Sequence, residues 1–388
     1  MKLFIITSRI PFPLDKGDKL RIYHQMKSLA KDHDIYLCAL KLPFSKQNSA
    51  AYQELKSFCK EVFILKLSAL QILLSLAKAL ATKTPFQTAL FTTKKAKKTV
   101  HNLVQKVKPE HIYCQLTRAA EYVKNAKEPK TIDYMDVFSK GMERRAHKAP
   151  LYLKWLYLWE ASKQRDYECS LFRKFNNHTI ITKEDRAFVN HPRNLEIKII
   201  KNGVDFAHFK PQKTETKYDI VFVGNMGYAP NIDAAEFLCK DLLPILQKEI
   251  PKIKILLAGT QPSKAVLKLQ SNSVTVSGWM HDIRKAYASS TLFIAPMRIG
   301  TGLQNKLLEA MAMNKPCIST SLAANPINAP EQALLVGNTK EELAALCLEL
   351  LQNEAKRTQV STNGHEFVKN TFEWTKTTEK LNKLFYSN

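Results

Sequence analysis

Short apolar runs alternate along the chain with stretches whose apolar residues recur at helical spacing. Residues 2–8 (KLFIITS) and 34–40 (DIYLCAL) are typical of buried strands, and residues 18–32 between them show a helical pattern. Four further apolar runs follow, with helical stretches between them: EVFILKL, HIYCQL, KTIDYM and HTIITK. A βαβα order of this kind predicts a parallel sheet that is covered by helices on both faces.

Residues 201–217 interrupt the alternation with glycine, proline and polar residues, which is typical of a linker. The alternation then resumes, with strand-like runs at 218–224, 252–259, 274–278, 291–296 and 315–320 and helical stretches at 231–249 and 303–313. The sequence therefore predicts an α/β protein with two Rossmann-like doubly wound domains that face each other across a cleft. We expect an N-terminal domain over 1–205, a C-terminal domain over 206–371 and a C-terminal helix over 372–388.

The chain is strongly basic, with 59 Lys and Arg against 35 Asp and Glu among 388 residues and a formal net charge of +24. Residues 1–200 hold 37 basic and 18 acidic side chains, so most of the excess positive charge lies in the first half. Such a charge favours an anionic partner, which can be nucleic acid, a phosphorylated substrate or a membrane surface.

The residue composition favours the cytoplasm. Seven cysteines without CxxC spacing predict neither a disulfide framework nor a zinc site and suit a reducing compartment. Only four consecutive apolar residues precede Thr7, too few for a signal peptide, and no apolar run of about 18 residues predicts a membrane span. The ten histidines show no HxxxH or HxH pattern, so no metal site is expected.

The segment with the most chemical information is PMRIGTGLQNKLLEAMAMNKPCIST, residues 296–320. It begins at the end of a predicted strand and continues through a loop with Gly300 and Gly302 into a predicted helix. Two glycines allow backbone N–H groups to approach a ligand closely, and the N-terminus of the next helix favours an anion. Arg298 adds a planar guanidinium group that suits phosphate.

Two charged side chains follow on the predicted helix. Lys306 adds a positive charge near the helix N-terminus, and Glu309, one turn further on, is suited to accept hydrogen bonds from sugar hydroxyls. The alternative is an ordinary helix on which both side chains are merely solvated.

This segment resembles the donor-binding signature of retaining glycosyltransferases with the GT-B fold, in the family-4-like group (glycosyl transferases group 1). Residues 220–238 and 274–296 resemble strands, a glycine loop and helix starts of that group's C-terminal domain, and 202–211 resemble its NGVD junction. The N-terminal stretch resembles the family's opening loop, in which Gly17 lies between strand and helix. The resemblance extends over nearly the whole chain and suggests the sugar transferases of bacterial exopolysaccharide systems as the subgroup.

The resemblance implies donor-binding roles for a set of residues: Gly17, Gly224, Asn225, Gly300, Thr301, Gly302, Lys306 and Glu309. Glu309 matches the second of two family glutamates and is expected to hold the nucleotide ribose, whereas Lys306 is expected to meet the diphosphate. Thr301 replaces the first glutamate, so the donor sugar stays open. The family's Arg/Lys pair after the first strand of this domain is absent, and Arg298 and Lys306 are expected to supply its charge during catalysis. The GT-B fold requires no metal cofactor.

The first domain offers fewer candidates, because the family's histidine is not found after the run at 111–116. Asp136 ends a predicted strand and is either an acceptor-side catalytic base, a hydrogen-bond acceptor or the N-cap of the next helix. The aromatic stripe of residues 150–175 is more typical of core. Glu160 and Glu168 on the same helix either touch an acceptor or face solvent, and the solvated face is favoured.

Together these features predict a retaining glycosyltransferase that moves a sugar from a nucleotide-diphosphate sugar to a glycan or lipid-linked acceptor. A GT-B sugar-nucleotide epimerase or hydrolase is the first alternative, because it shares the fold, but it would need a tight set of carboxylates. A basic nucleic-acid-binding protein is the second. No RNA-binding signature, zinc finger or helix-turn-helix pattern supports it, so no nucleic-acid partner is expected.

A basic, leucine-rich stretch at 63–98 predicts that the first domain docks on the anionic inner face of a membrane. The polar residues of its helical part lie on one side: Lys66, Ser68, Gln71, Ser75 and Lys78. Four lysines follow: Lys94, Lys95, Lys97 and Lys98. The alternative is that this helix covers the sheet of its own domain and the lysines are solvated.

Overall fold

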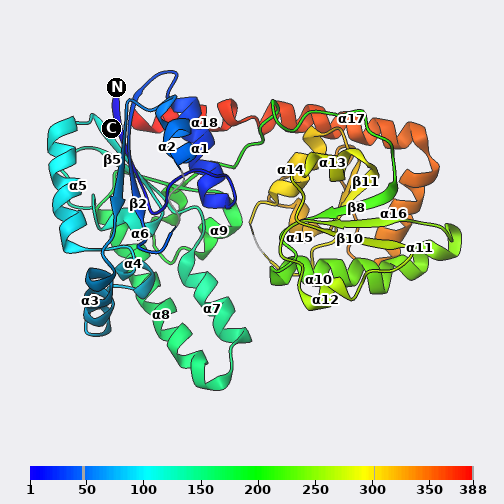
Figure 1. The fold of residues 1–388 in the computed structure, drawn as a ribbon, viewed down its shortest axis with the longest axis horizontal. Helices are drawn as coiled ribbons and strands as arrows, with labels where there is room; N and C mark the ends of the chain where they lie inside the picture. The colour runs from blue at the N-terminus through cyan, green and yellow to red at the C-terminus, as the bar shows by residue number, and fades with distance from the viewer. Residues whose placement is uncertain (46–48, 301, 387–388) are drawn as a thin grey trace. The chain divides into compact units, whose positions relative to one another are not determined.

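The protein divides into two compact units in the computed structural model, which describes residues 1–45, 49–300 and 302–386. The first unit contains Met1–Lys201 and Trp374–Asn388, and the second contains Asn202–Glu373. Each unit is a parallel sheet covered by helices (Figure 1). The prediction of two doubly wound α/β domains is therefore confirmed.

The boundaries between the units differ by a few residues from the expected ones at 205/206 and 371/372. They fall at 201/202 and 373/374. The reason is local pairing, because Val204 forms an isolated parallel bridge with Glu373 and donates its N–H to the Phe372 carbonyl at 2.7 Å. These hydrogen bonds tie both connecting segments to the second unit.

The sheet of the first unit has, within the described residues, seven strands in the order β3-β2-β1-β4-β5-β6-β7. All neighbouring strands are parallel. The strands are β1 (Lys2–Thr7), β2 (Asp34–Lys41), β3 (Glu61–Lys66), β4 (His111–Gln115), β5 (Lys130–Asp133), β6 (Asn177–Ile180) and β7 (Lys198–Ile199). The strand order reverses between β1 and β4, which is the topological switch point where ligands of such sheets bind.

The helices of this unit are α1 (Gly17–Leu29), α2 (Ser49–Lys56), α3 (Ala69–Leu80), α4 (Phe86–Ala89), α5 (Lys94–Val107), α6 (Thr117–Ala120), α7 (Phe138–Lys148), α8 (Leu151–Ser170), α9 (Lys183–Phe188) and α18 (Trp374–Phe385). The C-terminal α18 packs on α1, where the His24 and Trp374 rings stack at 5.1 Å. In Figure 1, α7 and α8 form a pair that projects away from the sheet. Among the described residues no helix has the length and apolar character needed to cross a membrane.

The sheet of the second unit has the order β10-β9-β8-β11-β12-β13 and is also parallel. Its strands are β8 (Tyr218–Val223), β9 (Ile255–Ala258), β10 (Val274–Gly278), β11 (Ser290–Ala295), β12 (Cys317–Ser319) and β13 (Leu335–Val336). Its helices are α10 (Ala229–Phe237), α11 (Leu243–Glu249), α12 (Lys264–Leu267), α13 (Arg284–Ala288), α14 (Asn305–Ala312), α15 (Ser321–Ala324), α16 (Lys340–Gln352) and α17 (Glu354–Thr371). A π-helical turn at Leu238–Leu242 separates α10 from α11, so the single helix expected over 231–249 is interrupted.

The interpretation of α8 from sequence is wrong in two respects. Tyr152 and Trp155 were expected in the core, but they are 73% and 65% exposed. Glu160 and Glu168 were expected to be solvated, but both are buried. Glu160 accepts hydrogen bonds from two N–H groups at the start of α4, and Glu168 accepts them from the N–H and hydroxyl of Ser139. Burial raises the pKa of Glu168 to about 7.

A buried ion pair connects three elements of the first unit. Arg21 on α1 donates through Nε to Asp133 Oδ2 at 2.7 Å and through a terminal nitrogen to Oδ1 at 3.2 Å, and both side chains are fully buried. The hydroxyl of Thr179 on β6 donates to Asp133 Oδ1 at 2.9 Å. The carboxylate at the end of β5 therefore fixes α1 against the carboxyl edge of the sheet.

We expect Asp133→Asn to destabilise the first unit by about 3–5 kcal/mol, because it leaves the buried guanidinium of Arg21 without a counter-ion. Thermal and urea unfolding of the full chain will measure the loss. The double variant Arg21→Met, Asp133→Leu should recover much of it, since it removes both buried charges. Glu196→Gln is the control, because it breaks the exposed Arg193–Glu196 pair and should leave unfolding unchanged. Equal effects of Asp133→Asn and Glu196→Gln would contradict the assigned role.

Candidate functional site

The candidate site lies at the carboxyl edge of the second sheet, where β8 and β11 are neighbours. The strand order reverses between these two strands, so the loops that follow them diverge, and parallel sheets bind their ligands at such a point. The loop after β8 contains Gly224 and Asn225, and the loop after β11 contains Arg298, Gly300 and Gly302. The topology therefore brings two separate sets of predicted residues to one edge.

Gly224 and Gly259 form a backbone contact that only glycines allow. A Cβ on Gly259 would lie 1.7 Å from the Gly224 carbonyl oxygen, and Gly259 has a φ of +142°. A Cβ on Gly224 would lie 2.7 Å from the amide nitrogen of Asn231. The β8 and β9 loops therefore pack backbone against backbone, which fixes the floor of the site without side chains in the way.

Lys306 on the first turn of α14 places its amine at this switch point. Nζ donates to Asn231 Oδ1 at 2.5 Å and lies 3.9 Å from the sulfur of Met297 after β11. It also lies 4.7 Å from the centre of the Phe222 ring on β8. Burial lowers the pKa of this amine to about 7, and only the nearby carboxylate of Glu309 opposes that shift.

Asn231 connects the amine to the glycine loop. Its Nδ2 donates to the Asn225 carbonyl at 2.9 Å, which leaves Oδ1 to accept from Lys306. The side-chain oxygen of Asn225 accepts from the Gly227 N–H at 2.9 Å and closes the turn. Asn225 thus shapes the loop, and Asn231 holds the lysine.

The two glycines after β11 have backbone conformations that favour glycine. Gly300 has a φ of +114° and Gly302 a φ of +84°, both in the region that favours glycine. A Cβ on Gly300 would lie 3.4 Å from Pro230 in the first turn of α10. Thr301 lies outside the described residues. Neither α10 nor α14 has a side-chain cap at its N-cap residue. In the first turn of α10, Pro230 has no N–H and the Asn231 N–H donates to the Tyr228 carbonyl at 2.9 Å, so α14 offers more N–H groups to a ligand than α10.

Arg298 was expected to supply positive charge together with Lys306, but its side chain lies along α10. Its guanidinium makes two hydrogen bonds to the carboxylate of Asp233 on α10, at 2.8 and 3.1 Å, and lies 4.4 Å from the Phe237 ring centre. The side chain is 46% exposed and is paired along α10 instead of standing beside Lys306. The charge that the site directs inward is therefore that of Lys306.

Glu309 lies beneath the first turn of α14. Its Oε2 accepts a hydrogen bond from the hydroxyl of the buried Tyr287 at 2.8 Å. Burial raises the pKa of Glu309, while the Tyr287 hydrogen bond and the charge of Lys306 oppose the shift. The carboxylate is thus oriented by one fixed donor and is positioned one turn from the amine.

Two predicted residues belong to the first unit. Gly17 begins α1 after β1, and a Cβ there would meet nothing within 4 Å, so space does not require glycine. Asp136 was expected to end a strand, but β5 ends at Asp133, and Asp136 is an exposed loop residue 3.9 Å from Arg144. It is not the N-cap either, because Val137 occupies that position before α7.

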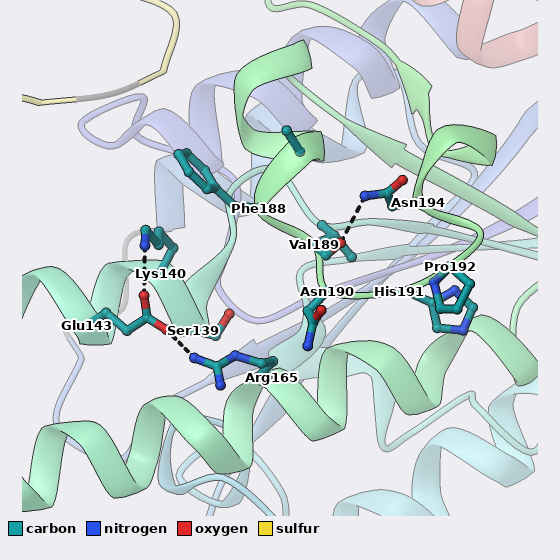
Figure 2. A pocket seen from close by; sticks show the side chains of 11 residues that line it. Ser139, Lys140, Glu143, Arg165, Phe188, Val189, Asn190, His191, Pro192 and Asn194 are labelled. Atoms are coloured by element: carbon teal, nitrogen blue, oxygen red, sulfur yellow. Dashed lines mark hydrogen bonds and ion pairs between the residues drawn. The ribbon is translucent and has the colours of Figure 1, made fainter.

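A polar cavity of about 530 Å³ lies between α7, α8 and the segment after α9 in the same unit. Figure 2 shows Glu143 between Lys140 and Arg165, with both cations paired to its carboxylate. Phe188, whose ring centre lies 5.3 Å from the Lys140 amine, and Asn190 also line the cavity. The cavity could not be predicted from the sequence, because three separate elements contribute its walls.

The sequence also missed Asn231, Gly259 and Tyr287. Gly259 had a usable signal, since it directly follows a predicted strand just as Gly224 does. Asn231 and Tyr287 had none, because their roles depend on Lys306 and Glu309, which lie 75 and 22 residues away.

Comparisons with known proteins agree with this geometry. Residues 217–353 match the family of glycosyl transferases group 1. An uncharacterized 44.6 kDa protein in the cps region of Klebsiella pneumoniae is 23% identical over 96% of both chains. An uncharacterized glycosyltransferase of Methanocaldococcus jannaschii is 23% identical over 55% of this chain and 59% of its own.

The fold is shared with Anabaena HepE, which was solved in complex with UDP and glucose. The two chains align over their full lengths, 100% of each, with a TM-score of 0.68 and 14% identity. The resemblance that the sequence predicted is confirmed by the family match, the relatives and the fold together. The second unit carries a glycosyl transferases group 1 domain at residues 217–353, and the chain shares the GT-B fold of solved glycosyltransferases.

Proposed function

We propose that the protein is a retaining glycosyltransferase that uses a nucleotide-diphosphate sugar and passes the sugar to a polysaccharide or lipid-linked acceptor. The observation that carries the proposal is the buried amine of Lys306 at the switch point of the second sheet. Among the described residues, the amine contacts the amide of Asn231, the sulfur of Met297 and the Phe222 ring, and the nearby carboxylate of Glu309 is hydrogen-bonded to Tyr287. A diphosphate would supply a direct counter-charge.

Departure of the nucleotide diphosphate is the step in which negative charge grows. Lys306 and the N-terminus of α14 lie around the place where that charge would develop. Such groups are already oriented before the reaction, so they stabilise the transition state without rearranging. Arg298 would hold α10 in place through Asp233, and its guanidinium would contribute only a more distant charge.

Glu309 is proposed to bind the ribose of the nucleotide. Tyr287 occupies Oε2 and fixes the plane of the carboxylate, so that its other oxygen can accept from a hydroxyl. Asn225, Gly300 and Gly302 would bring backbone N–H groups to the donor. The Gly224 N–H donates to the Ala258 carbonyl at 3.0 Å, so Gly224 would contribute a close approach of the backbone and not an N–H group. In the first unit, Gly17 is proposed to contact the donor and Asp136 to contact the acceptor.

The relatives suggest which substrates to test first. HepE was solved with UDP and glucose, so UDP-sugars are the first donors for a thermal-shift screen. The Klebsiella relative lies in a cps region, which supports a polysaccharide acceptor. All seven cysteines are free thiols, which suits the cytoplasmic setting proposed here.

The alternative functions have distinct signatures in the same assays. Turnover of a sugar nucleotide without any acceptor would favour an epimerase or hydrolase. Salt-sensitive DNA binding with no response to sugar nucleotides would favour a nucleic-acid-binding protein.

We expect Glu309→Ala to weaken donor binding by about 1–3 kcal/mol, because a hydrogen bond to a charged group is lost. Lys306→Met should reduce turnover more than ground-state binding, because the diphosphate charge grows in the transition state. Calorimetry and steady-state kinetics with the donor found in the screen will separate the two effects. Lys285→Met, at an exposed lysine on nearby α13, is the control and should match the wild type. Normal affinity and turnover in both site variants would refute the assignment.

Donor binding should also depend on pH. The amine of Lys306 has a pKa of about 7 in the free protein, so its charged fraction falls as the pH rises above that value. A bound diphosphate raises the pKa by stabilising the charge, so affinity should fall by up to about tenfold per pH unit above neutrality. Titrations of the donor from about pH 6 to about pH 9 will measure this slope. The Lys306→Met variant should show a flat profile, and an identical slope in wild type and variant would contradict the prediction.

A further inference from the structure

Helix α3 exposes its apolar side to solvent. Leu70, Leu73 and Leu74 lie at i, i+3 and i+4 on one face, and they are 67%, 64% and 62% exposed. Helices on a globular domain normally turn such a stripe toward the core, because exposed leucines gain nothing from the hydrophobic effect. The alternative in which this helix covers its own domain applies to the opposite side of α3, where Ile72 and Leu76 pack against the core of the first unit.

The side of α3 that faces the protein is mixed. Ile72 and Leu76 pack against the core of the first unit, and two polar side chains beside them form hydrogen bonds. The Ser75 hydroxyl donates to the Thr92 carbonyl at 2.7 Å, and the side-chain oxygen of Gln71 accepts from the Lys95 N–H at 3.4 Å. These hydrogen bonds anchor α3 to the segment that begins α5. They fix the orientation in which the leucines point outward.

A second apolar set lies at the start of α8. Leu151, Trp155 and Leu158 lie at i, i+4 and i+7, with exposures of 85%, 65% and 43%, and Tyr152 beside them is 73% exposed. They lie toward the far end of the α7–α8 pair, which projects from the first unit (Figure 1). A large exposed aromatic and aliphatic cluster of this kind marks an interaction surface.

Direct contacts hold the two apolar sets in one arrangement. The amine of Lys163 on α8 donates to the Ala79 carbonyl at the end of α3. Glu160 accepts from the Phe86 N–H at 3.0 Å, and the rings of Trp159 and Phe86 lie 5.3 Å apart. Figure 1 shows α3 and α8 extending on the same side of the unit. We call the two sets together the apolar rim.

The surroundings of the rim are basic. Residues 62–109 contain nine lysines and not a single Asp or Glu. Lys94, Lys95 and Lys98 are exposed. A groove of about 530 Å³ beside α3 is lined by Leu74, Lys78, Lys94 and Lys97, and by Glu121, which is paired with Lys97. Leucines and lysines therefore share one surface, which complements an apolar layer beneath an anionic one.

We propose that the apolar rim docks the first unit on an anionic lipid bilayer, with the leucines of α3 and Trp155 inserted among the lipids and the lysines at the headgroups. Amphipathic helices with flanking lysines lie on a bilayer in this way without crossing it. This inference goes beyond the proposed function, because vesicle binding requires no sugar donor and can be measured when donor chemistry fails.

Charge favours a bilayer over a second copy of the chain as the occupant. Two copies that met through the rim would bring the lysines of both chains together, with no acidic residue of 62–109 to offset them. An anionic headgroup layer pairs with the same lysines. Self-association through the rim is therefore the competing outcome that the experiments below must distinguish.

Vesicle sedimentation of the full chain tests the apolar part of the rim. The probes are vesicles of phosphatidylcholine alone and of phosphatidylcholine with phosphatidylglycerol. We expect binding to the anionic vesicles, a fall in binding with salt, and at least about a tenfold loss in the triple variant Leu70→Gln, Leu73→Gln, Leu74→Gln. The matched control is Leu195→Gln, Leu267→Gln, Leu322→Gln, which changes three exposed leucines outside the rim and should bind like the wild type.

Tryptophan emission tests insertion directly. Trp155 and Trp279 are similarly exposed, at 65% and 68%, and lie in the first and second unit respectively. Anionic vesicles should shift the emission to the blue, and Trp155→Phe should abolish the shift whereas Trp279→Phe should keep it. A shift that persists in Trp155→Phe would exclude insertion through α8.

The basic part is tested by the quadruple variant in which Lys94, Lys95, Lys97 and Lys98 become Gln. It should bind anionic vesicles at least about tenfold more weakly. The control changes Lys248, Lys252, Lys264 and Lys268 of the second unit to Gln, which alters the net charge equally and should cost less than about twofold. An equal loss of vesicle binding in both quadruple variants would mean that net charge alone drives adsorption. It would refute the proposal that the apolar rim is the docking surface.

Two further results would overturn the proposal. One is that the wild type fails to sediment with anionic vesicles. The other is a wild-type dimer in sedimentation velocity that becomes a monomer in the leucine triple variant, with no vesicle binding by either protein. That result would assign the rim to contact with a second copy of the chain. Circular dichroism and thermal melting of each variant will show that a loss of binding is not a loss of fold.

Discussion

The buried amine of Lys306 is the constraint on which the second unit's site depends. Its neighbours come from β8, α10 and the loop after β11, and all of them are uncharged apart from Glu309 one turn away. A lysine in such surroundings loses hydration, which lowers its pKa to about 7 and leaves it ready to gain from an incoming anion. The glycine contact between the β8 and β9 loops keeps the adjoining space clear of side chains.

The first unit also contains a buried cation, but there a carboxylate balances the charge. Arg21 is fully buried but meets the carboxylate of Asp133 and, through it, the hydroxyl of Thr179. Its charge is already balanced, so it fixes α1 to the sheet and has little to offer a ligand. The buried cation at the edge of the second sheet can therefore attract an anionic ligand, whereas the buried cation of the first sheet cannot.

The orientation of α3 follows from hydrogen bonds whose partners lie outside the helix. Ser75 and Gln71 bond to the segment that begins α5, and this holds the leucines outward at a cost in exposed apolar surface. A bilayer would remove that cost, since lipid chains bury the leucines and anionic headgroups meet the lysines. The proposed donor site and the proposed docking surface thus belong to different units of the chain.

The alternation of apolar runs and helical stretches by itself determined both parallel sheets, because short buried strands and amphipathic helices have distinct periods. The loop glycines after β11, Lys306 and Glu309 were also evident, since one short segment carries them. Only the tertiary structure decided that Arg298 pairs with Asp233, that Asp136 lies beyond its strand, and that α3 and α8 expose their apolar faces. The physical reason is that periodicity shows that a helix has two faces, whereas the partners that choose which face is buried lie far away in the sequence.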